Sequence, residues 1–216
     1  MLKYEPHVHS NHSDGNNSVK EILDEAIKKK IEIISITDHD TLNGSLEAIE
    51  IVNEEHLPII VIPGIEISTK NGHLLVYRID REVEKGMEMA ETIKAAKELG
   101  GFTVLTHPFE FYRHGCVKPN YFKHVDAVEV FNAKSYLNFL ASYFANKYKK
   151  PIMAGSDAHS VYTIGYGLTL VDLNVEMKHK NDNTVSNRVF EAIMGFKVKI
   201  EGKRVPLRLR LTKLFK

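Results

Sequence analysis

Short apolar runs that alternate with helical patterns constrain the fold of this chain most strongly. The apolar runs at 31–37, 59–62, 102–106, 127–130, 152–155 and 168–173 have the length and the β-branched content of buried strands. Helical periodicity separates several of them, at about 19–27, 46–52, 84–99, 135–148 and 187–194. Repeated strand–helix alternation predicts an α/β fold with parallel strands, either a barrel or an open sheet.

Local signals indicate where these elements begin and end. Ser18 and Glu21 have the spacing of a capping box at the start of the first helix. Asn71-Gly72 favours a hairpin between strands at 65–69 and 73–79. Gly100-Gly101 predicts the end of the helix at 84–99, and Glu201-Gly202 predicts a second hairpin near the end of the sequence.

Composition excludes several classes of protein. A chain of 216 residues with 43% hydrophobic and 26% charged residues predicts one ordinary globular domain. The net charge of +1 gives no support at the whole-chain level to a strongly basic nucleic-acid binder. No uncharged stretch is long enough to span a bilayer, and no apolar signal segment is visible, so no membrane association is expected. Because Cys116 is the single cysteine, we expect a cytoplasmic protein and a structural thiol.

Six of the eleven histidines lie in short motifs at predicted strand ends. His7-Val8-His9 follows the opening segment, and this spacing places both imidazoles on one face of a strand. Other histidines and carboxylates follow later strands or flank the predicted hairpin, namely Asp14, Asp38-His39-Asp40, Glu66, His73, His107 and Asp157-Ala158-His159. Side chains on the loops after successive barrel strands converge at the carboxyl-terminal face. Imidazole mixed with carboxylate is the ligand set of Zn, Mn or Fe, so we expect a metal site there.

The remaining histidines have no such context. A single histidine at a strand end is more often a hydrogen-bonded structural or surface residue than a ligand. His12, His56, His124 and His179 are expected to be bystanders, and so is His114 unless its loop turns toward the site. Asp38 and Asp40 could cap the following helix, and Asp40 could equally orient a liganding imidazole.

Five of these motifs, in order, resemble the PHP (polymerase and histidinol phosphatase) family. They are His7-Val-His9-Ser-Asn-His-Ser-Asp14-Gly, Thr37-Asp-His39-Asp, Pro63-Gly-Ile-Glu66-Ile, Thr106-His107-Pro and Gly155-Ser-Asp157-Ala-His159. The resemblance implies a single PHP-type domain over residues 1–216, with its motifs within 5–171. It also implies a distorted TIM-like (βα)7 barrel with two to three divalent ions, Zn, Mn or Fe, at the carboxyl-terminal face. The ligands it implies are His7, His9, Glu66 and Asp157 for one ion, Asp14, His39 and His159 for a second, and Glu66, His73 and His107 for a third, with Glu66 bridging.

Two features depart from the family pattern. Glu5-Pro6 stands where an Asp often precedes the first histidine pair, and no subdomain is inserted between His107 and Asp157. With little sequence available to cover the site, we expect a shallow cleft bordered by 109–118 and 162–166. Arg113 and His114 lie in the first of these loops, where cations could hold a substrate phosphate, although a solvated loop is an equal alternative.

The resemblance implies a metal-dependent phosphoesterase in which a metal-activated hydroxide attacks phosphorus. His159 and Asp40 are the candidates for the acid that protonates the leaving group. The substrate would be a small phosphomonoester or phosphodiester, such as a nucleotide, an oligonucleotide end, or a sugar or histidinol phosphate. Two alternatives remain open, a non-catalytic metal-binding accessory domain of a nucleic-acid-processing assembly and a metallohydrolase acting on C–N bonds.

The segment at 203–216 carries six basic residues and no acidic one, with leucines between them. This pattern fits an amphipathic strand that packs on the barrel, a dimer contact or an RNA-facing strip. We expect structural packing, with nucleic acid as an alternative partner.

Overall fold

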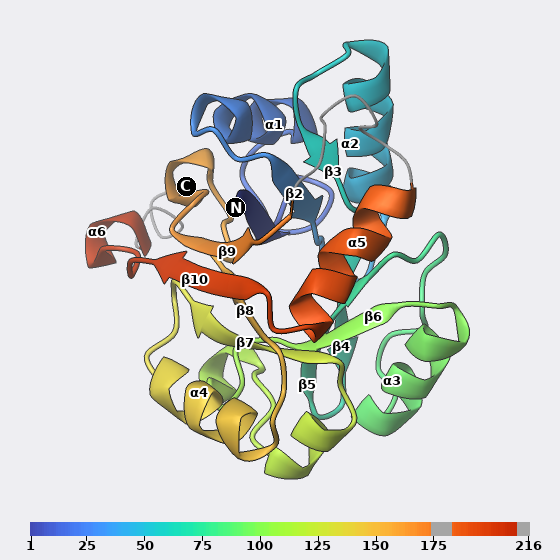
Figure 1. Cartoon of the computed structure of the whole chain (residues 1–216), viewed down its shortest axis with the longest axis vertical. Coiled ribbons are helices and arrows are strands. Elements are labelled where there is room, and N and C mark those ends of the chain that lie inside the picture. Colours follow the sequence, from blue (N-terminus) through green and yellow to red (C-terminus); the bar gives the residue numbers. More distant parts are fainter. Residues whose placement is uncertain (174–182, 211–216) are drawn as a thin grey trace.

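The computed structural model describes residues 1–173 and 183–210, and their strands form two five-stranded sheets (Figure 1). The first sheet has the order β10 (Val198–Gly202), β9 (Gly167–Val171), β1 (Leu2–Val8), β2 (Ile33–Ile36) and β3 (Ile60–Val61). The second has the order β4 (Gly64–Thr69), β5 (Gly72–Tyr77), β6 (Phe102–Leu105), β7 (Ala127–Asn132) and β8 (Ile152–Gly155). The α/β class is therefore confirmed.

In each sheet one strand runs against the other four, β9 in the first sheet and β5 in the second. β1, β2 and β3 are parallel, as are β6, β7 and β8, whereas β9 and β10 and the hairpin β4–β5 pair antiparallel. Isolated bridges pair Val8 with Ala158 and His39 with Glu66, so the two sheets meet near the carboxyl ends of β1 and β2. Because the described ladders do not close into one ring, the predicted (βα)7 barrel is not confirmed.

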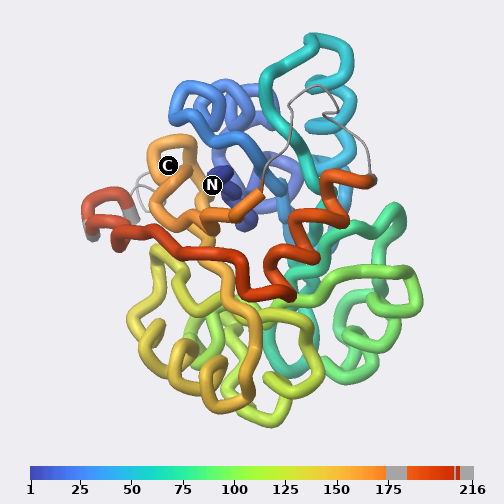
Figure 2. Tube along the Cα trace, viewed as in Figure 1, coloured from blue at the N-terminus to red at the C-terminus, as the bar shows by residue number. Residues whose placement is uncertain are grey.

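Helices cover the outer faces of both sheets (Figures 1 and 2). α1 (Val19–Lys28) and α2 (Asn43–Glu54) bury their apolar faces with β2 and β3, and α3 (Met89–Glu98) and α4 (Asn138–Lys147) do the same on the second sheet. The predicted capping box of α1 is present, because the Ser18 hydroxyl accepts from the backbone N–H of Glu21 and the Glu21 carboxylate accepts from that of Ser18. No described helix is long and apolar enough to cross a membrane.

The space between the sheets is filled by large side chains and closed at one end by α5 (Asn183–Met194). Tyr4, Tyr77 and Val104 are fully buried there. Phe190 of α5 stacks on Phe102 at 4.3 Å between ring centroids, close to the amino-terminal end of β6. α5 therefore covers the amino-terminal ends of the parallel strands and leaves the opposite ends for the site.

Several element boundaries differ from the sequence predictions. The helix expected from residue 84 begins at Met89, because the Glu88 and Glu91 carboxylates form a capping box there. The helix expected from residue 135 begins at Asn138. The hairpin predicted at Glu201-Gly202 is wrong, since β10 pairs back onto β9 and the chain then turns away.

The basic segment also differs from its prediction. Its described part forms α6 (Leu207–Arg210) after a short extended stretch rather than an amphipathic strand. Residues 211–216 of that segment, and His179, lie outside the described residues.

Candidate metal centre

The nine predicted ligands approach one another at one end of the strands. His7 is in β1 and His9 follows it, His39 follows β2, His107 follows β6, and Asp157 and His159 follow β8. Glu66 and His73 are on β4 and β5, and Asp14 is on the loop after β1. The parallel strands thus supply most ligands at their carboxyl ends, and the antiparallel hairpin supplies the other two.

Glu66 is the centre of this arrangement. Its carboxylate is buried, with 1% exposure, and faces five imidazoles. Oε2 lies 3.2 Å from Nε2 of both His7 and His9 and 3.5 Å from Nδ1 of His39. Oε1 lies 3.3 Å from Nδ1 of His73 and 3.1 Å from Nε2 of His107. Because each oxygen faces a separate set of imidazoles, this carboxylate has the position expected of a bridging ligand.

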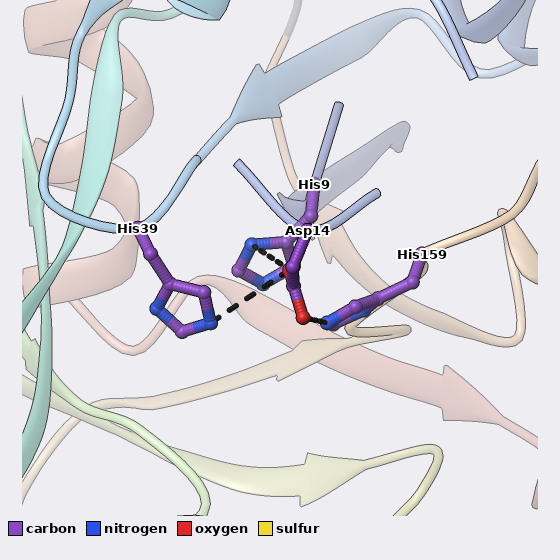
Figure 3. Close-up of side chains that lie close together, drawn as sticks. All are labelled: His9, Asp14, His39 and His159. Carbon is purple, nitrogen blue, oxygen red and sulfur yellow. Dashed lines mark ion pairs between the residues drawn. The ribbon is translucent and has the colours of Figure 1, made fainter. Parts of the chain in front are cut away.

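A second group of side chains surrounds Asp14 (Figure 3). One Asp14 oxygen lies 3.0 Å from Nε2 of His159, and the other lies 3.8 Å from Nδ1 of His9 and 3.9 Å from Nε2 of His39. The potential ligand atoms of these four residues all lie within 4.8 Å of one another. The potential ligand atoms of two further groups also lie within 4.8 Å of one another: His7, His9 and Glu66 form one, and His39, Glu66 and His73 form the other.

The donor atoms fit divalent ions of the zinc type. Two nitrogens bound to one tetrahedral zinc lie about 3.3 Å apart, and Nε2 of His7 and His9 are 3.1 Å apart. Nδ1 of both His9 and His107 is buried without a hydrogen-bond partner among the described residues. A buried nitrogen without a partner is costly unless something else contacts it.

The charges of the site favour metal ligation. Burial opposes charge on Glu66 and Asp157, yet the surrounding cations keep the pKa of each carboxyl well below its usual range. For Asp157 the main cations are Arg113 and Lys134. Burial keeps the pKa of His9 well below its usual value, with His159 adding to the effect. The ionised carboxylates favour ligation. Burial opposes charge on His7 and His73, yet nearby carboxylates raise the pKa of both imidazoles, so a bound ion would displace their protons.

Glu129 was not predicted from the sequence, although it holds two of the predicted ligands in place. Its buried carboxylate lies 2.9 Å from Nδ1 of His7 and accepts from the backbone N–H of His107 at 2.8 Å and from the Thr106 hydroxyl at 2.9 Å. A bond to the second nitrogen of an imidazole fixes which nitrogen can ligate. Its position inside the apolar run Ala127-Val-Glu-Val-Phe131, where an acidic residue would be buried, is the sequence signal that could have identified it.

Lys134 was also missed, because it lies in a loop with no distinctive motif. Its Nζ lies 3.2 Å from an Asp157 oxygen and 2.6 Å from Nδ1 of His159. Arg113 pairs with the other Asp157 oxygen and donates to Asn132 at 3.2 Å. Two cations thus meet at one carboxylate at the edge of the site.

The two other aspartates near His39 bind backbone rather than cap α2, which has no side-chain cap. The Asp38 carboxylate accepts from the Ser10 backbone N–H at 2.7 Å and from the Ser10 and Ser13 hydroxyls at 2.6 Å, which fixes the loop that carries Asp14. The Asp40 carboxylate accepts from the Ser68 N–H at 2.7 Å. The alternative that these residues cap the helix is therefore wrong.

His107 and Asp157 have left-handed backbone conformations, with φ of 27° and 53°. Residues with side chains rarely adopt this region, and where they do the strain is often found at functional sites. Each of these residues lies two positions after the end of a parallel strand, so the unusual turn directs its side chain across the strand ends.

A cavity of about 250 Å³ opens beside the ligands. Its lining consists of His39, Glu66, His73, His107, Arg113, His114, Lys134, Asp157 and His159. The loop at 109–118 therefore borders the cavity through Arg113 and His114, whereas the segment at 162–166 contributes no lining residue. Among the predicted bystanders, His12 contacts Glu47 on α2 and lies away from this cavity.

Sequence and structure comparisons agree on the family. The PHP domain description matches residues 5–156, and a PHP-associated description matches residues 136–180. An uncharacterized protein of Methanocaldococcus jannaschii is 31% identical over 61% of this chain and 82% of its own length. A 5'-3' exoribonuclease of Haemophilus influenzae is 34% identical over 44% of this chain and 36% of its own length.

One solved structure with a similar fold is a two-domain protein from Bacteroides vulgatus, described as containing a predicted PHP-like metal-dependent phosphoesterase. Its TM-score is 0.76 at 19% identity, over 94% of this chain and 65% of that chain. This likeness supports the fold, and the family match covers more than half of the chain and holds seven of the nine predicted ligands. The chain belongs to the PHP domain family.

Proposed function

We propose that this chain is a metal-dependent phosphoesterase that hydrolyses a phosphomonoester or phosphodiester. The observation that carries the proposal is the Glu66 carboxylate, which faces five imidazoles beside a cavity lined by cations. Two to three Zn, Mn or Fe ions fit these ligands. Such ions, when bound, lower the pKa of water and neutralise phosphoryl oxygens.

Each proposed ion has its own set of ligands. His7, His9, Glu66 and Asp157 would hold the first, Asp14, His39 and His159 the second, and Glu66, His73 and His107 the third. In the structure, His9 and His39 each belong to two clusters of potential ligand atoms, so neighbouring metal sites have residues in common.

The cations of the cavity are proposed to bind the substrate phosphate. Arg113 and Lys134 lie on either side of Asp157, and the His114 ring packs at a tilt against His73, with 5.4 Å between ring centroids. An arginine fork and a lysine ammonium match the oxygens of a phosphate group. These residues would position the phosphorus beside the ligands and stabilise the charge that develops on its oxygens.

His159 and Asp40 are proposed as the groups that could protonate the leaving alkoxide. His159 lines the cavity, and its Nε2 faces Asp14. Asp40 directs its carboxylate toward the Ser68 backbone and is absent from the cavity lining. Of the two, only His159 lines the cavity, but its proposed role as a ligand of the second ion competes with proton donation.

A substrate panel tests the proposal directly. Protein reconstituted with Mn or Zn is expected to hydrolyse phosphomonoesters or phosphodiesters faster than amides or lactones at matched metal loading. His56→Ala serves as the control for His39→Ala, since both are histidines with some exposure and only His39 is a proposed ligand. Loss of activity in His39→Ala with retention in His56→Ala is expected. Preferential amide hydrolysis would favour the C–N alternative, and metal binding without any hydrolysis would favour the accessory-domain alternative.

A further inference from the structure

Three large aromatic side chains lie exposed beside the cations of the cavity. Phe111 and Tyr112 directly precede Arg113 and are 73% and 53% exposed, and Tyr136, two residues after Lys134, is 54% exposed. The buried Glu110 carboxylate ties the two segments together by accepting from the backbone N–H groups of Tyr136 and Leu137, the latter at 2.6 Å. The two segments that carry these aromatic residues and the lining cations Arg113 and Lys134 are therefore joined to each other.

Basic residues from the far end of the chain reach the same edge. After β10, the backbone N–H of Lys203 donates to the Tyr166 carbonyl and that of Val205 donates to the Ala133 carbonyl, both at 2.8 Å. Nζ of Lys203 lies 4.5 Å from the centre of the Tyr166 ring, and Cζ of Arg204 lies 3.9 Å from the centre of the Tyr136 ring. We call Phe111, Tyr112, Tyr136, Tyr166, Lys203 and Arg204 the aromatic rim.

The sheet topology places the aromatic rim on the same side as the metal centre. β9 runs antiparallel to β1, so Gly167 lies toward the carboxyl end of β1, from which His7 and His9 project. Gly202 pairs with Gly167, and Ala133 directly follows β7. The segment from Lys203 to Val205 therefore crosses the carboxyl-terminal side of the strands, next to Lys134.

Alternating aromatic rings and cations suit one class of ligand in particular. Bases of any sequence stack on exposed rings and on arginine planes, while lysine and arginine contact the connecting phosphates. A small phosphate ester held at Arg113 and Lys134 would not need rings outside the cavity.

We propose that the aromatic rim binds a single-stranded nucleic acid whose phosphate enters the metal-centre cavity. This inference rests on the proposed phosphoesterase function for the fate of that phosphate, but the binding surface stands on its own geometry. It also assigns a role to the first residues of the basic segment.

Binding can be measured without hydrolysis. The probe is a 3'-fluorescein, 5'-phosphorylated single-stranded oligoadenylate of 12 nucleotides, compared by anisotropy with an abasic backbone of equal length and charge. Removing one stacking ring is expected to weaken base-containing strands about tenfold, so Tyr136→Ala should reduce the preference for oligoadenylate over the abasic strand. Tyr136→Phe, which keeps the ring, should restore it. Arg204→Ala should weaken both strands and lower the salt dependence of binding.

Matched controls come from the rest of the surface. Tyr143→Ala removes an exposed ring on α4 outside the aromatic rim, and Arg81→Ala removes an exposed arginine that follows β5 at the opposite end of the strands. Both are expected to bind the strands as the wild type does. The proposal is overturned if Tyr136→Ala and Tyr143→Ala bind oligoadenylate equally, or if the wild type does not distinguish it from the abasic strand. Binding that depends on the aromatic rim, without hydrolysis of any phosphoester, would support the proposed binding surface. It would contradict only the phosphoesterase proposal.

Discussion

At the scale of single residues, the sequence predicts most of the proposed ligands but not the residues that hold them in position. His7, His9, His107 and His159 stand out because they occur in short motifs at strand ends, where side chains of a parallel sheet converge. Glu129 resembles any acidic residue until the fold buries it against His7. The spacing of residues predicts which face they share, but not which distant strand supplies their hydrogen-bond partner.

Glu66→Gln is expected to lower metal content and activity together. The amide keeps the shape of the side chain but removes the charge that faces two sets of imidazoles. His56→Ala should leave both quantities near the wild-type values, because His56 is an exposed residue beyond α2. Elemental analysis and phosphoester turnover measure the pair. Equal losses in the two variants would contradict the separation of ligands from bystanders.

Glu129→Gln is expected to weaken metal binding about 10- to 100-fold, as the loss of a group that orients a liganding histidine typically does. The amide cannot provide the charged acceptor that now holds His7 and the His107 backbone. Competition with a chromophoric chelator measures the affinity, and circular dichroism checks that the fold persists. An affinity close to that of the wild type would show that Glu129 does not position His7.

Arg113→Ala is expected to raise KM for phosphoesters more than it lowers kcat, because the guanidinium is proposed to bind the phosphate in the ground state as well as in the transition state. Arg113→Lys should recover part of the loss, since it keeps the charge but not the fork. Kinetics on two phosphoesters with different leaving groups measure the effect. Unchanged KM and kcat on both substrates would contradict a role of the loop at 109–118 in phosphate binding.

At the scale of elements, the β4–β5 hairpin shows what turn chemistry can and cannot predict. Asn71-Gly72 predicts the turn, and the structure has it, with Gly72 at a φ of 128°. The sequence does not show that this turn also packs on the loop carrying Arg113. A Cβ at Gly72 would lie 2.6 Å from the Cys116 nitrogen, and the His73 N–H donates to the His114 carbonyl at 2.8 Å. Local sequence patterns cannot predict this contact, because it joins the hairpin turn to a loop about 40 residues away in the sequence.

Gly72→Ala is therefore expected to lower the free energy of unfolding by more than the cost of placing an alanine at a positive φ, because the added Cβ would also clash with the loop. Gly86→Ala is the matched control, because Gly86 also has a positive φ, of 76°, but a Cβ added there would meet no atom within 4 Å. The control should lower the free energy of unfolding by about 1 kcal/mol, and Gly72→Ala by roughly 1–3 kcal/mol more. Urea denaturation measures both. Equal losses would show that the loop moves away at no cost.

At the scale of the whole molecule, the alternation of strands and helices predicts the α/β class but not the way the strands assemble. Two sheets meet through the Val8–Ala158 and His39–Glu66 bridges instead of forming one closed ladder. Strand pairing at such edges depends on residues far apart in the sequence, such as β1 with β9. Periodicity within a segment carries no information about these partners.

Removing the metal is expected to lower Tm, because ligands from both sheets would lose the ions between them. About three ions per chain should be found after reconstitution, and less than one would contradict the cluster. An ion at 100 times its Kd stabilises the folded state by about 2.7 kcal/mol. Calorimetry with and without a chelator measures the shift, and reloading with Mn or Zn should reverse it.

The order of the ligands along the chain has a consequence for biosynthesis. His7 and His9 leave the ribosome early, whereas Asp157 and His159 follow after about 150 further residues, and β9, which pairs with β1, follows later still. Domains form as units during translation, at about 5–20 residues per second. A nascent chain therefore spends roughly 8–30 seconds with an incomplete set of the proposed ligands. The proposed hydrolytic activity would therefore require translation to pass β9, and truncated products that lack Asp157 and His159 are expected to be inert.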